Sequence, residues 1–242
     1  MVSEFVYLVL GCQNSGRREV LYDIVKDLAS ESGPFTVLIS ESETSNDWQV
    51  KLSELDNVTI ELFLGETGTI KPEHLNPHHT NVILSLGLAN PVDQVEAMKL
   101  LFEQVNCDLG RILTVVHCDQ LESHKQLFSW YDACIHFSDA CLVNRGNETT
   151  NQFVQNFINR YEEQHFPCLF ETTRGGSVKN PGLILEPQAR RISLYFEPKE
   201  DRWLDEEQDW DDDESSVDPY IQRLAGGSRA KWIPEIQTIL NG

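Results

Sequence analysis

Two glycines five positions apart, Gly11 and Gly16, stand between a short apolar run and a longer amphipathic one. The first run, residues 5–10, reads FVYLVL and suits a strand buried on both faces. Beyond Gly16, apolar residues recur at helical spacing as far as Leu28. Strand, glycine turn and helix in this order are the opening unit of an α/β fold, so this segment constrains the fold more than any other.

The segment GCQNSGRR, residues 11–18, has the spacing of a phosphate-binding P-loop, G-x-x-x-x-G-K-[ST]. In that motif backbone N–H groups wrap a phosphate, the lysine reaches its outer oxygens, the hydroxyl binds Mg²⁺, and the helix N-terminus favours the anion. Here arginines replace both the lysine and the hydroxyl residue. The alternative is a tight turn that needs glycine but binds no ligand. The predicted phosphate contacts are Gly11, Gln13, Asn14, Ser15, Gly16, Arg17 and Arg18.

Strand-length apolar runs and helical stripes alternate along most of the chain. Further strands are predicted at residues 35–39, 58–63, 82–86, 112–116, 140–143 and 169–172, and helices at 92–105 and 152–161. This alternation predicts an α/β fold with a doubly wound, mostly parallel sheet of the P-loop NTPase type, whose ligands bind at the carboxyl ends of the strands. We expect a P-loop domain over residues 1–172 and a C-terminal extension over 173–242.

The extension carries weaker signals. Arg190–Phe196 alternates well enough for one more strand or a hairpin arm. A short terminal helix beginning at Pro234 is expected to pack Ile236, Ile239 and Leu240 on the body of the protein.

Charge and composition narrow the classes of partner. The chain of 242 residues has 39 acidic and 19 basic residues, a formal net charge of −20, which argues against a broad contact with nucleic acid or anionic lipid. Neither a signal peptide nor a membrane-length apolar run is recognised, so we expect a cytoplasmic protein. Its 6 cysteines are dispersed without a C-x-x-C pair, which favours reduced thiols.

Much of the charge comes from one acidic segment, residues 199–218. It contains eleven acidic residues against Lys199 and Arg202, interrupted by apolar residues such as Trp203 and Trp210. Like charges at this density favour a solvated segment, whereas the apolar residues suggest docking on a partner or on the chain itself. Both interpretations remain open.

Four landmarks in order resemble the CobW-like metal-handling GTPases, relatives of UreG and HypB in the SIMIBI group of P-loop proteins. The first is the P-loop. The second, Val37 to Asp47, looks like the family's V-I-V-N-E stretch ending in a switch Asp. The third, Val82–Pro91, resembles V-I-E-T-S-G-L-A-D-P, and the fourth, Phe137–Asn147, is similar to F-A-D-x-x-x-x-N-K-x-D. The resemblance covers roughly residues 4–170 and implies GTP or GDP as the ligand.

Departures from the family pattern fall on the groups that handle charge and metal. Arg17 can still pair with a phosphate, but Arg18 cannot ligate Mg²⁺. The family's acidic residue in E-T-S-G is Leu84 here. Phosphoryl transfer depends on a metal and positioned groups to stabilise charge, so these losses predict slow hydrolysis or none. The resemblance therefore implies a degenerate member in which Mg²⁺ is doubtful.

The guanine-selecting segment is altered more mildly. Asn144 matches the family's Asn, whereas Arg145 replaces Lys and Asn147 replaces Asp. An Asn offers one carbonyl oxygen where Asp accepts with two, so guanine preference should weaken. The resemblance makes Asn144, Arg145 and Asn147 nucleotide contacts, while a polar turn after a strand remains the alternative.

The family's metal motif N-G-C-x-C-C is missing, since residues 64–69 read LGETGT. Histidines at 74, 78 and 79 are interpreted as an exposed loop rather than as a ligand set. If the chain is an active GTPase, Glu41, Asp47 or Asp119 would have to take over Mg²⁺; Glu41 and Asp47 are the predicted metal ligands.

Three functions remain open. The leading hypothesis is a degenerate CobW-like P-loop protein that binds GTP, GDP or another phosphate ligand weakly if at all and acts through contacts with a client protein. The second is an active GTPase assisting metal insertion, a metallochaperone. The third is an acidic protein-interaction module without nucleotide. The resemblance also implies a homodimer formed across the nucleotide face.

Overall fold

A computed structural model describes residues 5–31, 33–43, 45–65, 67–105, 107–146, 148–197 and 217–240. Within these residues the chain forms one sheet of seven strands in the order β3-β2-β4-β1-β5-β6-β7, with every pair parallel. The strands are β1 (Phe5–Leu10), β2 (Phe35–Ser40), β3 (Val58–Phe63), β4 (Thr80–Leu84), β5 (Asp108–His117), β6 (Ala140–Arg145) and β7 (Leu169–Arg174). The predicted α/β fold with a doubly wound parallel sheet is confirmed.

Helices occupy the connections between the strands. They are α1 (Arg17–Glu31), α2 (Asp47–Ser53), the 3₁₀ turns η1 (Thr67–Thr69) and η2 (Pro72–His74), α3 (Pro91–Phe102), α4 (Cys118–Ser123), α5 (Leu127–His136), α6 (Asn151–Glu162), α7 (Pro181–Ile184) and α8 (Ile236–Leu240). Two starts follow local capping rules. Asn90 caps α3 by accepting a hydrogen bond from the N–H of Val92, and Thr150 caps α6 by accepting one from Phe153.

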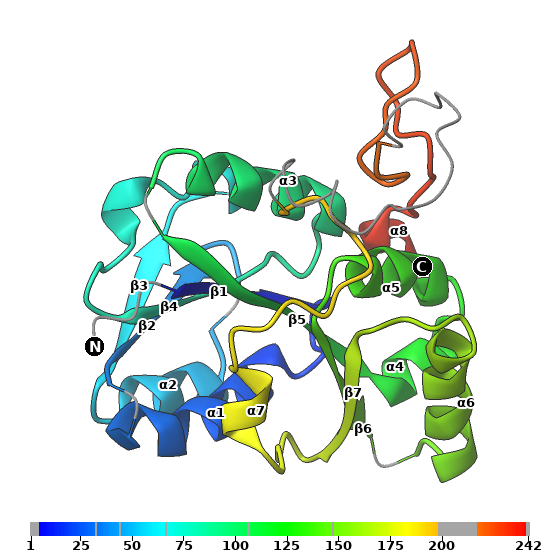
Figure 1. Cartoon of the computed structure of the whole chain (residues 1–242). Helices are drawn as coiled ribbons and strands as arrows, with labels where there is room; N and C mark the ends of the chain where they lie inside the picture. Colours follow the sequence, from blue (N-terminus) through cyan, green and yellow to red (C-terminus); the bar gives the residue numbers. More distant parts are fainter. Residues whose placement is uncertain are drawn as a thin grey trace, which may run out of the picture.

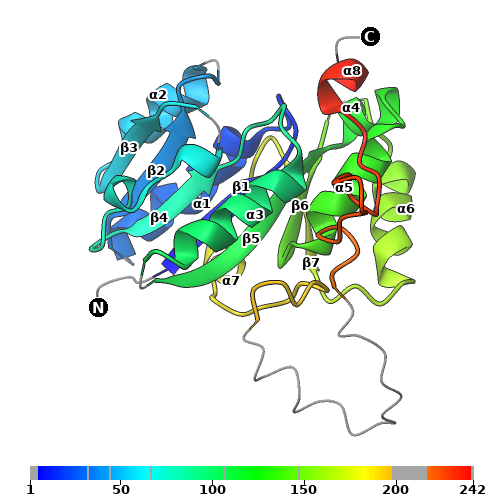
Figure 2. The same ribbon diagram turned by 90° about the horizontal axis from the view of Figure 1, so that it is seen from above.

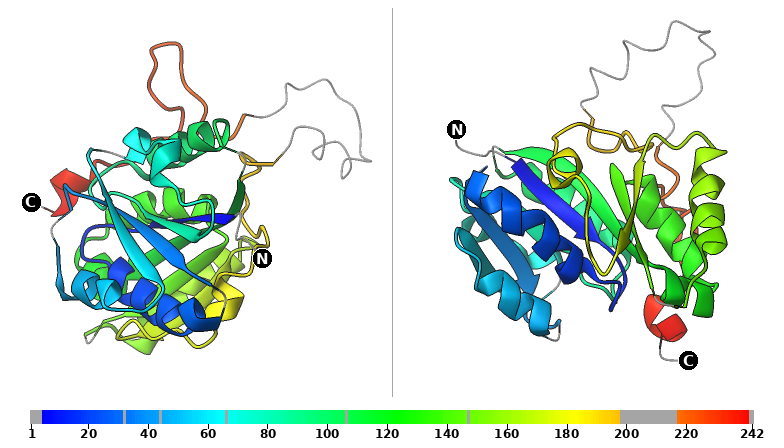
Figure 3. Two further views of the ribbon diagram at one scale, coloured as in Figure 1. Left: turned by 90° about the vertical axis from the view of Figure 1, so that its left-hand side faces the viewer. Right: turned by 90° about the horizontal axis from the view of Figure 1, so that it is seen from below.

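The sheet lies between two helical layers (Figure 1). One layer contains α1, α2 and α7, which Figure 3 shows from below in its right panel; the other contains α3, α5, α6 and α8, seen from above in Figure 2. Each layer covers its own buried apolar cluster, because alternate residues of one strand point to opposite faces. Leu8 and Leu10 of β1 belong to the cluster under α3 and α5, whereas Val9 belongs to the one under α1.

Position in the sheet explains the sequence pattern of each strand. The central strand β1 is fully buried from Val6 to Leu10, and β4 and β5 pair with it on either side. The edge strands β3 and β7 are mostly half-exposed or exposed. Central strands of a parallel sheet are covered on both faces, so they read as continuous apolar runs, as the sequence predicted.

Details of the predicted elements shift by a few residues. The strand expected over 82–86 is β4 and ends at Leu84, because Ser85 and Leu86 already belong to the loop at the carboxyl edge. The expected terminal helix forms as α8, beginning at Ile236 rather than Pro234, with Ile236 and Ile239 buried and Leu240 half-buried. The predicted acidic segment 199–218 lies outside the described residues except for Val217 and Asp218.

The prediction of a strand or hairpin arm over Arg190–Phe196 is wrong. These residues are irregular and belong to a strap, residues 185–197, that crosses the amino end of the sheet from the α1 side to the α3 and α5 side (Figure 1). Their backbone donors bond outside any ladder: the N–H of Arg190 donates to Asp139, and that of Ser193 to the carbonyl of His136. Alternation alone did not reveal these partners.

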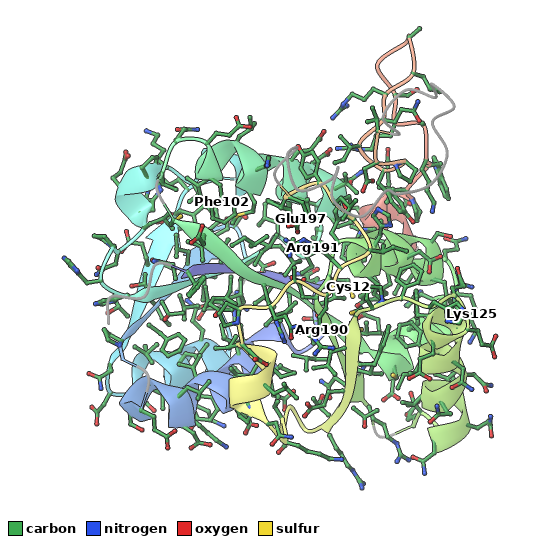
Figure 4. All side chains as sticks on the ribbon, viewed as in Figure 1. Cys12, Phe102, Lys125, Arg190, Arg191 and Glu197 are labelled. Carbon is green, nitrogen blue, oxygen red and sulfur yellow. The ribbon has the colours of Figure 1, made fainter. Side chains whose placement is uncertain are left out.

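Buried charges hold the strap in place. Asp139, fully buried before β6, accepts hydrogen bonds from the backbone N–H of Ile112 at 2.8 Å and of Arg190 at 2.7 Å. It also accepts two from Nη1 of Arg191, each at 3.0 Å, and Arg191 in turn pairs with Glu197, which Figure 4 labels beside it. Arg111 on β5 is fully buried and donates to carbonyl groups of Leu183, Ile184 and Gln188.

The chain returns to the body after the acidic segment. Asp218 accepts a hydrogen bond from Ser193, and its Oδ2 lies 2.7 Å from Nε2 of His136 on α5. Arg229 pairs with Asp93 and Glu96 on α3. The described residues contain no helix long and apolar enough to cross a membrane.

Candidate functional site

The glycine segment at residues 11–18 links the carboxyl end of β1 to the start of α1, as predicted. Asn14 and Gly16 both have positive φ, 64° and 90°. A Cβ on Gly16 would lie 2.6 Å from Nδ2 of Asn144, so glycine is required there both for its backbone conformation and for close approach. The segment and the carboxyl end of β6 are therefore in contact, which brings two of the sequence landmarks together.

The loop after β4 packs directly on this segment. The backbone N–H of Gln13 donates to the carbonyl of Gly87 at 2.9 Å. A Cβ on Gly87 would lie 2.5 Å from Nη2 of Arg17 and 2.6 Å from the backbone nitrogen of Gln13. One N–H of the glycine segment thus bonds to protein, and only glycine fits at position 87.

Both arginines that replace the P-loop's usual residues are paired with Glu43, which follows β2. Nη2 of Arg17 donates to Oε1 of Glu43 at 2.7 Å, and Nη2 of Arg18 donates to Oε2 at 3.2 Å. Arg17 also donates from Nη1 to the carbonyl of Ser85, and the N–H of Gly87 donates to Oε1 of Glu43 at 2.7 Å. The Glu43 carboxylate is therefore a shared acceptor for three donors at the carboxyl edge of the sheet.

This acid–arginine cluster is largely hidden from solvent. The side chains of Arg17 and Arg18 are 5% and 9% exposed, and that of Glu43 is 12% exposed. Burial lowers the pKa of Arg18, while the charge of Glu43 opposes that shift. Charges at this depth are tolerated because they are paired and hydrogen-bonded.

A small cavity of about 140 Å³ opens beside the cluster. Ser15 lies in its wall, fully buried, with an Oγ that has no hydrogen-bond partner among the described residues. Trp48 of α2 also lines the cavity, and its ring contacts Lys51 and Tyr22. The lining residues are Gln13, Asn14, Ser15, Gly16, Arg17, Arg18, Glu19, Glu43, Ser45, Asn46 and Trp48.

The predicted guanine-contacting residues are only partly brought to this cavity. Asn144 is buried and lies against Gly16. The side chain of Arg145 folds back on its own loop, where Nε donates to the carbonyl of Thr149 at 3.1 Å and Nη1 to Asn151. Asn147 lies outside the described residues. Their assignment as nucleotide contacts stays a prediction.

Asp119, one of the acids considered for Mg²⁺, closes the loop after β6. Its carboxylate accepts hydrogen bonds from the N–H of Thr149 at 2.8 Å, from the Thr149 hydroxyl, and from the N–H of Glu148 at 3.4 Å. Burial alone would raise the pKa of Asp119, but these hydrogen bonds outweigh it and hold the pKa below its ordinary value. Both carboxylate oxygens of Asp119 therefore already accept hydrogen bonds from the loop after β6.

The predicted metal ligands Glu41 and Asp47 are both exposed. Asp47 is the first residue of α2, behind the cap that Asn46 provides, and Glu41 donates its backbone N–H to Phe63. Across the part of the chain that the structure describes, no group of three or more His, Cys, Asp or Glu side chains is arranged to hold a metal ion. His74 and His79 hydrogen-bond to Lys71 and Thr36 instead.

The sequence did not single out three residues that shape this site: Glu43, Trp48 and Gln120. Gln120 of α4 donates to the carbonyl of Gln13 at 3.1 Å and accepts from the thiol of Cys12 at 2.9 Å, which ties the glycine segment to α4. Burial raises the pKa of Cys12 to about 11, so it is a packed thiol rather than a thiolate. The signal for Glu43 was its position just after β2, at the edge where ligands bind.

Comparisons with known proteins show the fold. No protein-family model matches the chain, and no curated protein matches it in sequence. Among solved structures, the signal recognition particle receptor FtsY from Elizabethkingia anophelis is similar, with a TM-score of 0.53, 15% identity and 77% of this chain covered. The Zn(II)-bound YjiA GTPase from E. coli gives a TM-score of 0.49, 13% identity and 77% coverage of this chain. The chain spans 63% of the FtsY chain and 62% of the YjiA chain, and its likeness to FtsY is one of fold.

Proposed function

We propose that this chain is a degenerate P-loop protein of the CobW-like type, which binds GTP, GDP or another phosphate ligand weakly if at all and acts through contacts with other proteins. One observation carries the proposal. The side chains at the two positions that would contact phosphate and Mg²⁺, Arg17 and Arg18, are engaged by the protein's own Glu43. A ligand must therefore compete with an internal carboxylate for these donors.

The chemistry of the replaced residues supports weak or absent hydrolysis. A guanidinium group carries no lone pair for a metal, and the fixed charge of Arg18 repels a divalent cation. Leu84, at the end of β4, offers no carboxylate to organise metal or water. Without a metal and a positioned water, transition-state charge on a transferring phosphoryl group is stabilised poorly.

Titration calorimetry with GTP, GDP and ATP, each with and without Mg²⁺, tests the proposal. We expect dissociation constants in the millimolar range or no measurable heat, and little difference between the titrations with and without Mg²⁺. Phosphate release should stay at the level of the buffer blank. Micromolar binding of GTP that requires Mg²⁺, together with steady turnover, would falsify the proposal and favour the metal-inserting GTPase.

The remaining parts of the proposal concern partners and location. A net charge of −20 disfavours contact with nucleic acid and anionic membranes and favours contact with a basic protein surface. We further propose that the protein acts in the cytoplasm and that it forms a homodimer. A deletion of residues 199–216 spares Asp218, which contacts Ser193 and His136. If the acidic segment is the contact surface, this deletion should abolish capture of a client protein while the circular dichroism spectrum stays unchanged; equal capture by both forms contradicts it.

A further inference from the structure

The Glu43 carboxylate lies where three donors converge. Arg17 and Arg18 donate from the P-loop positions, and the N–H of Gly87 donates from the loop after β4. Two guanidinium groups and a backbone N–H are the donor set that binds a tetrahedral oxyanion, because such an anion accepts charge-assisted hydrogen bonds from several directions. The Glu43 carboxylate has only two acceptor oxygens, which lie in one plane, whereas a tetrahedral oxyanion presents its oxygens in several directions.

Donors and acceptors beside Glu43 remain unsatisfied. Ser15 and Ser85 are 0% and 1% exposed, and neither hydroxyl has a hydrogen-bond partner in the described part of the chain. Ser15 lines the cavity. Ser85 lies in the loop after β4, and its backbone carbonyl accepts a hydrogen bond from Arg17. Buried hydroxyl groups are normally hydrogen-bonded, so the Ser15 hydroxyl in the cavity wall points to a polar ligand in the cavity.

The size of the space sets the class of ligand. The cavity measures about 140 Å³, well below the roughly 300–1,000 Å³ of pockets that enclose drug-sized molecules. A single phosphate-sized oxyanion fits such a volume, so of a larger molecule only the phosphate group would lie inside the cavity. The cavity also borders Glu43 itself, so removal of that side chain would enlarge it toward both arginines.

We propose that Glu43 is the internal occupant of an oxyanion site, and that a phosphate group binds there only by displacing the Glu43 side chain from Arg17, Arg18 and Gly87. The ligand is a small tetrahedral oxyanion, either inorganic phosphate or the terminal phosphate of a larger molecule. This inference rests on the proposed function, since it explains why a phosphate ligand would bind weakly. It also attributes the weak binding of phosphate to the side chain of Glu43, which lies outside the P-loop.

Glu43→Ala, probed with inorganic phosphate, tests the proposal. Calorimetry and thermal unfolding are run at constant ionic strength, with chloride replacing phosphate in the reference. Loss of the competing carboxylate should strengthen phosphate binding by about tenfold or more relative to the natural chain, and should raise the unfolding midpoint of the variant as phosphate is added. The natural chain should show little shift.

Three further variants locate the effect. Glu54 follows α2 and is exposed, so Glu54→Ala removes the same charge without touching the cluster and should behave like the natural chain. Combining Glu43→Ala with Arg17→Ala should abolish the gain, because the arginine would supply the main contact. Glu43→Gln keeps the shape of the side chain and replaces Glu43→Ala if the alanine variant fails to fold.

The outcomes separate this inference from the proposed function. If phosphate binds the Glu43 variants no better than the natural chain, or binds Glu54→Ala equally well, the inference is wrong, whatever GTP does. If phosphate binding rises in the Glu43 variants while the natural chain binds Mg²⁺ and GTP tightly and turns it over, the inference stands and the proposed function falls. Glu43→Gln should bind phosphate with an affinity between that of the natural chain and that of Glu43→Ala.

Discussion

The two ends of the sheet carry acid–arginine clusters of similar composition and different surroundings. At the amino end, Asp139 accepts from Arg191 and from two backbone N–H groups. At the carboxyl end, Glu43 accepts from Arg17, Arg18 and one backbone N–H. The side chain of Asp139 is 0% exposed, whereas that of Glu43 is 12% exposed and borders a cavity.

This difference shows how position decides the role of a buried ion pair. Asp139 is enclosed by the backbone that it binds, and both its oxygens are used, so nothing can take its place without moving β5, β6 and the strap. Glu43 reaches the site as a side chain from a loop, and free space lies next to it. The same charge pairing therefore stabilises the fold at one end and occupies an exchangeable position at the other.

The strongest test of this contrast is Asp139→Asn. It removes the negative charge from the buried pair and leaves the Arg191 side chain, 6% exposed, without its main counter-charge. Breaking a buried pair costs about 3–5 kcal/mol, so urea denaturation should show a loss of that size in the free energy of unfolding. Asp132→Asn, which breaks a more exposed pair with Arg160, should cost no more than about 1 kcal/mol. Equal losses in the two variants would contradict the structural role of Asp139.

Glu43→Ala should cost less and should be recoverable. Arg17 and Arg18 keep other partners or solvent access along the cavity, so we expect a loss of about 2 kcal/mol in the absence of phosphate, below the full value for a buried pair. Urea denaturation with increasing phosphate should restore part of this loss in Glu43→Ala and none in Asp139→Asn. Restoration in both variants would indicate a general effect of the anion and would remove the contrast.

Asp218→Asn tests the contact at the far end of the strap. Burial would raise the pKa of Asp218, but hydrogen bonds from His136 and Ser193 outweigh it and hold the pKa below the ordinary 3.8. A carboxylate with a depressed folded-state pKa stabilises the fold above that ordinary value and loses this contribution as the pH falls through the folded-state pKa. The substitution should cost about 1–2 kcal/mol at pH 7, and the deficit should shrink below about pH 4.

The measurement is chemical denaturation of both forms from pH 7 to pH 3. Ser193→Ala removes one of the two side-chain contacts of Asp218 and should give a smaller deficit with the same pH dependence. A deficit that does not change with pH would assign the loss to packing instead of charge.

The smallest expected effect is at the start of the strap. The buried hydroxyl of Tyr7 donates to the carbonyl of Leu185 at 2.6 Å, and burial raises the pKa of Tyr7 to about 12, so the group stays a donor at neutral pH. Tyr7→Phe removes one hydrogen bond and should cost about 1 kcal/mol in thermal unfolding. Tyr22→Phe, at a half-buried position of α1 beside Trp48, serves as the control and should be neutral. A neutral Tyr7→Phe would mean that the strap is held by the arginine contacts alone.

The sequence predicted the frame of the molecule because that frame depends on local patterns. Residues 5–10 and 58–63 form strands with the predicted bounds, and Gly16 turns the chain where the spacing of glycines required it. Apolar runs and glycine turns report burial and backbone conformation directly, and both are properties of neighbouring residues.

Contacts between segments that are distant in the sequence could not be predicted from such local patterns. Nothing in the local sequence indicates that Glu43 reaches residues 17, 18 and 87, or that Arg145 turns back on Thr149. The strand predicted over residues 190–196 failed for the same reason, since Asp139, far away in sequence, takes the donors of the strap. Side chains at a functional site are positioned by the fold as a whole.

The hydrogen bond between Ser193 and Asp218 joins residues 25 positions apart, so the acidic segment between them is a closed loop anchored at its base. The entropic cost of closing such a loop grows slowly, by about 0.6 kcal/mol for each doubling of its length. Once the base is fixed, the number of residues in the loop and their charges can change widely with little effect on the rest of the fold. Changes in the segment between residues 193 and 218 can thus leave the sheet and the glycine segment as they are.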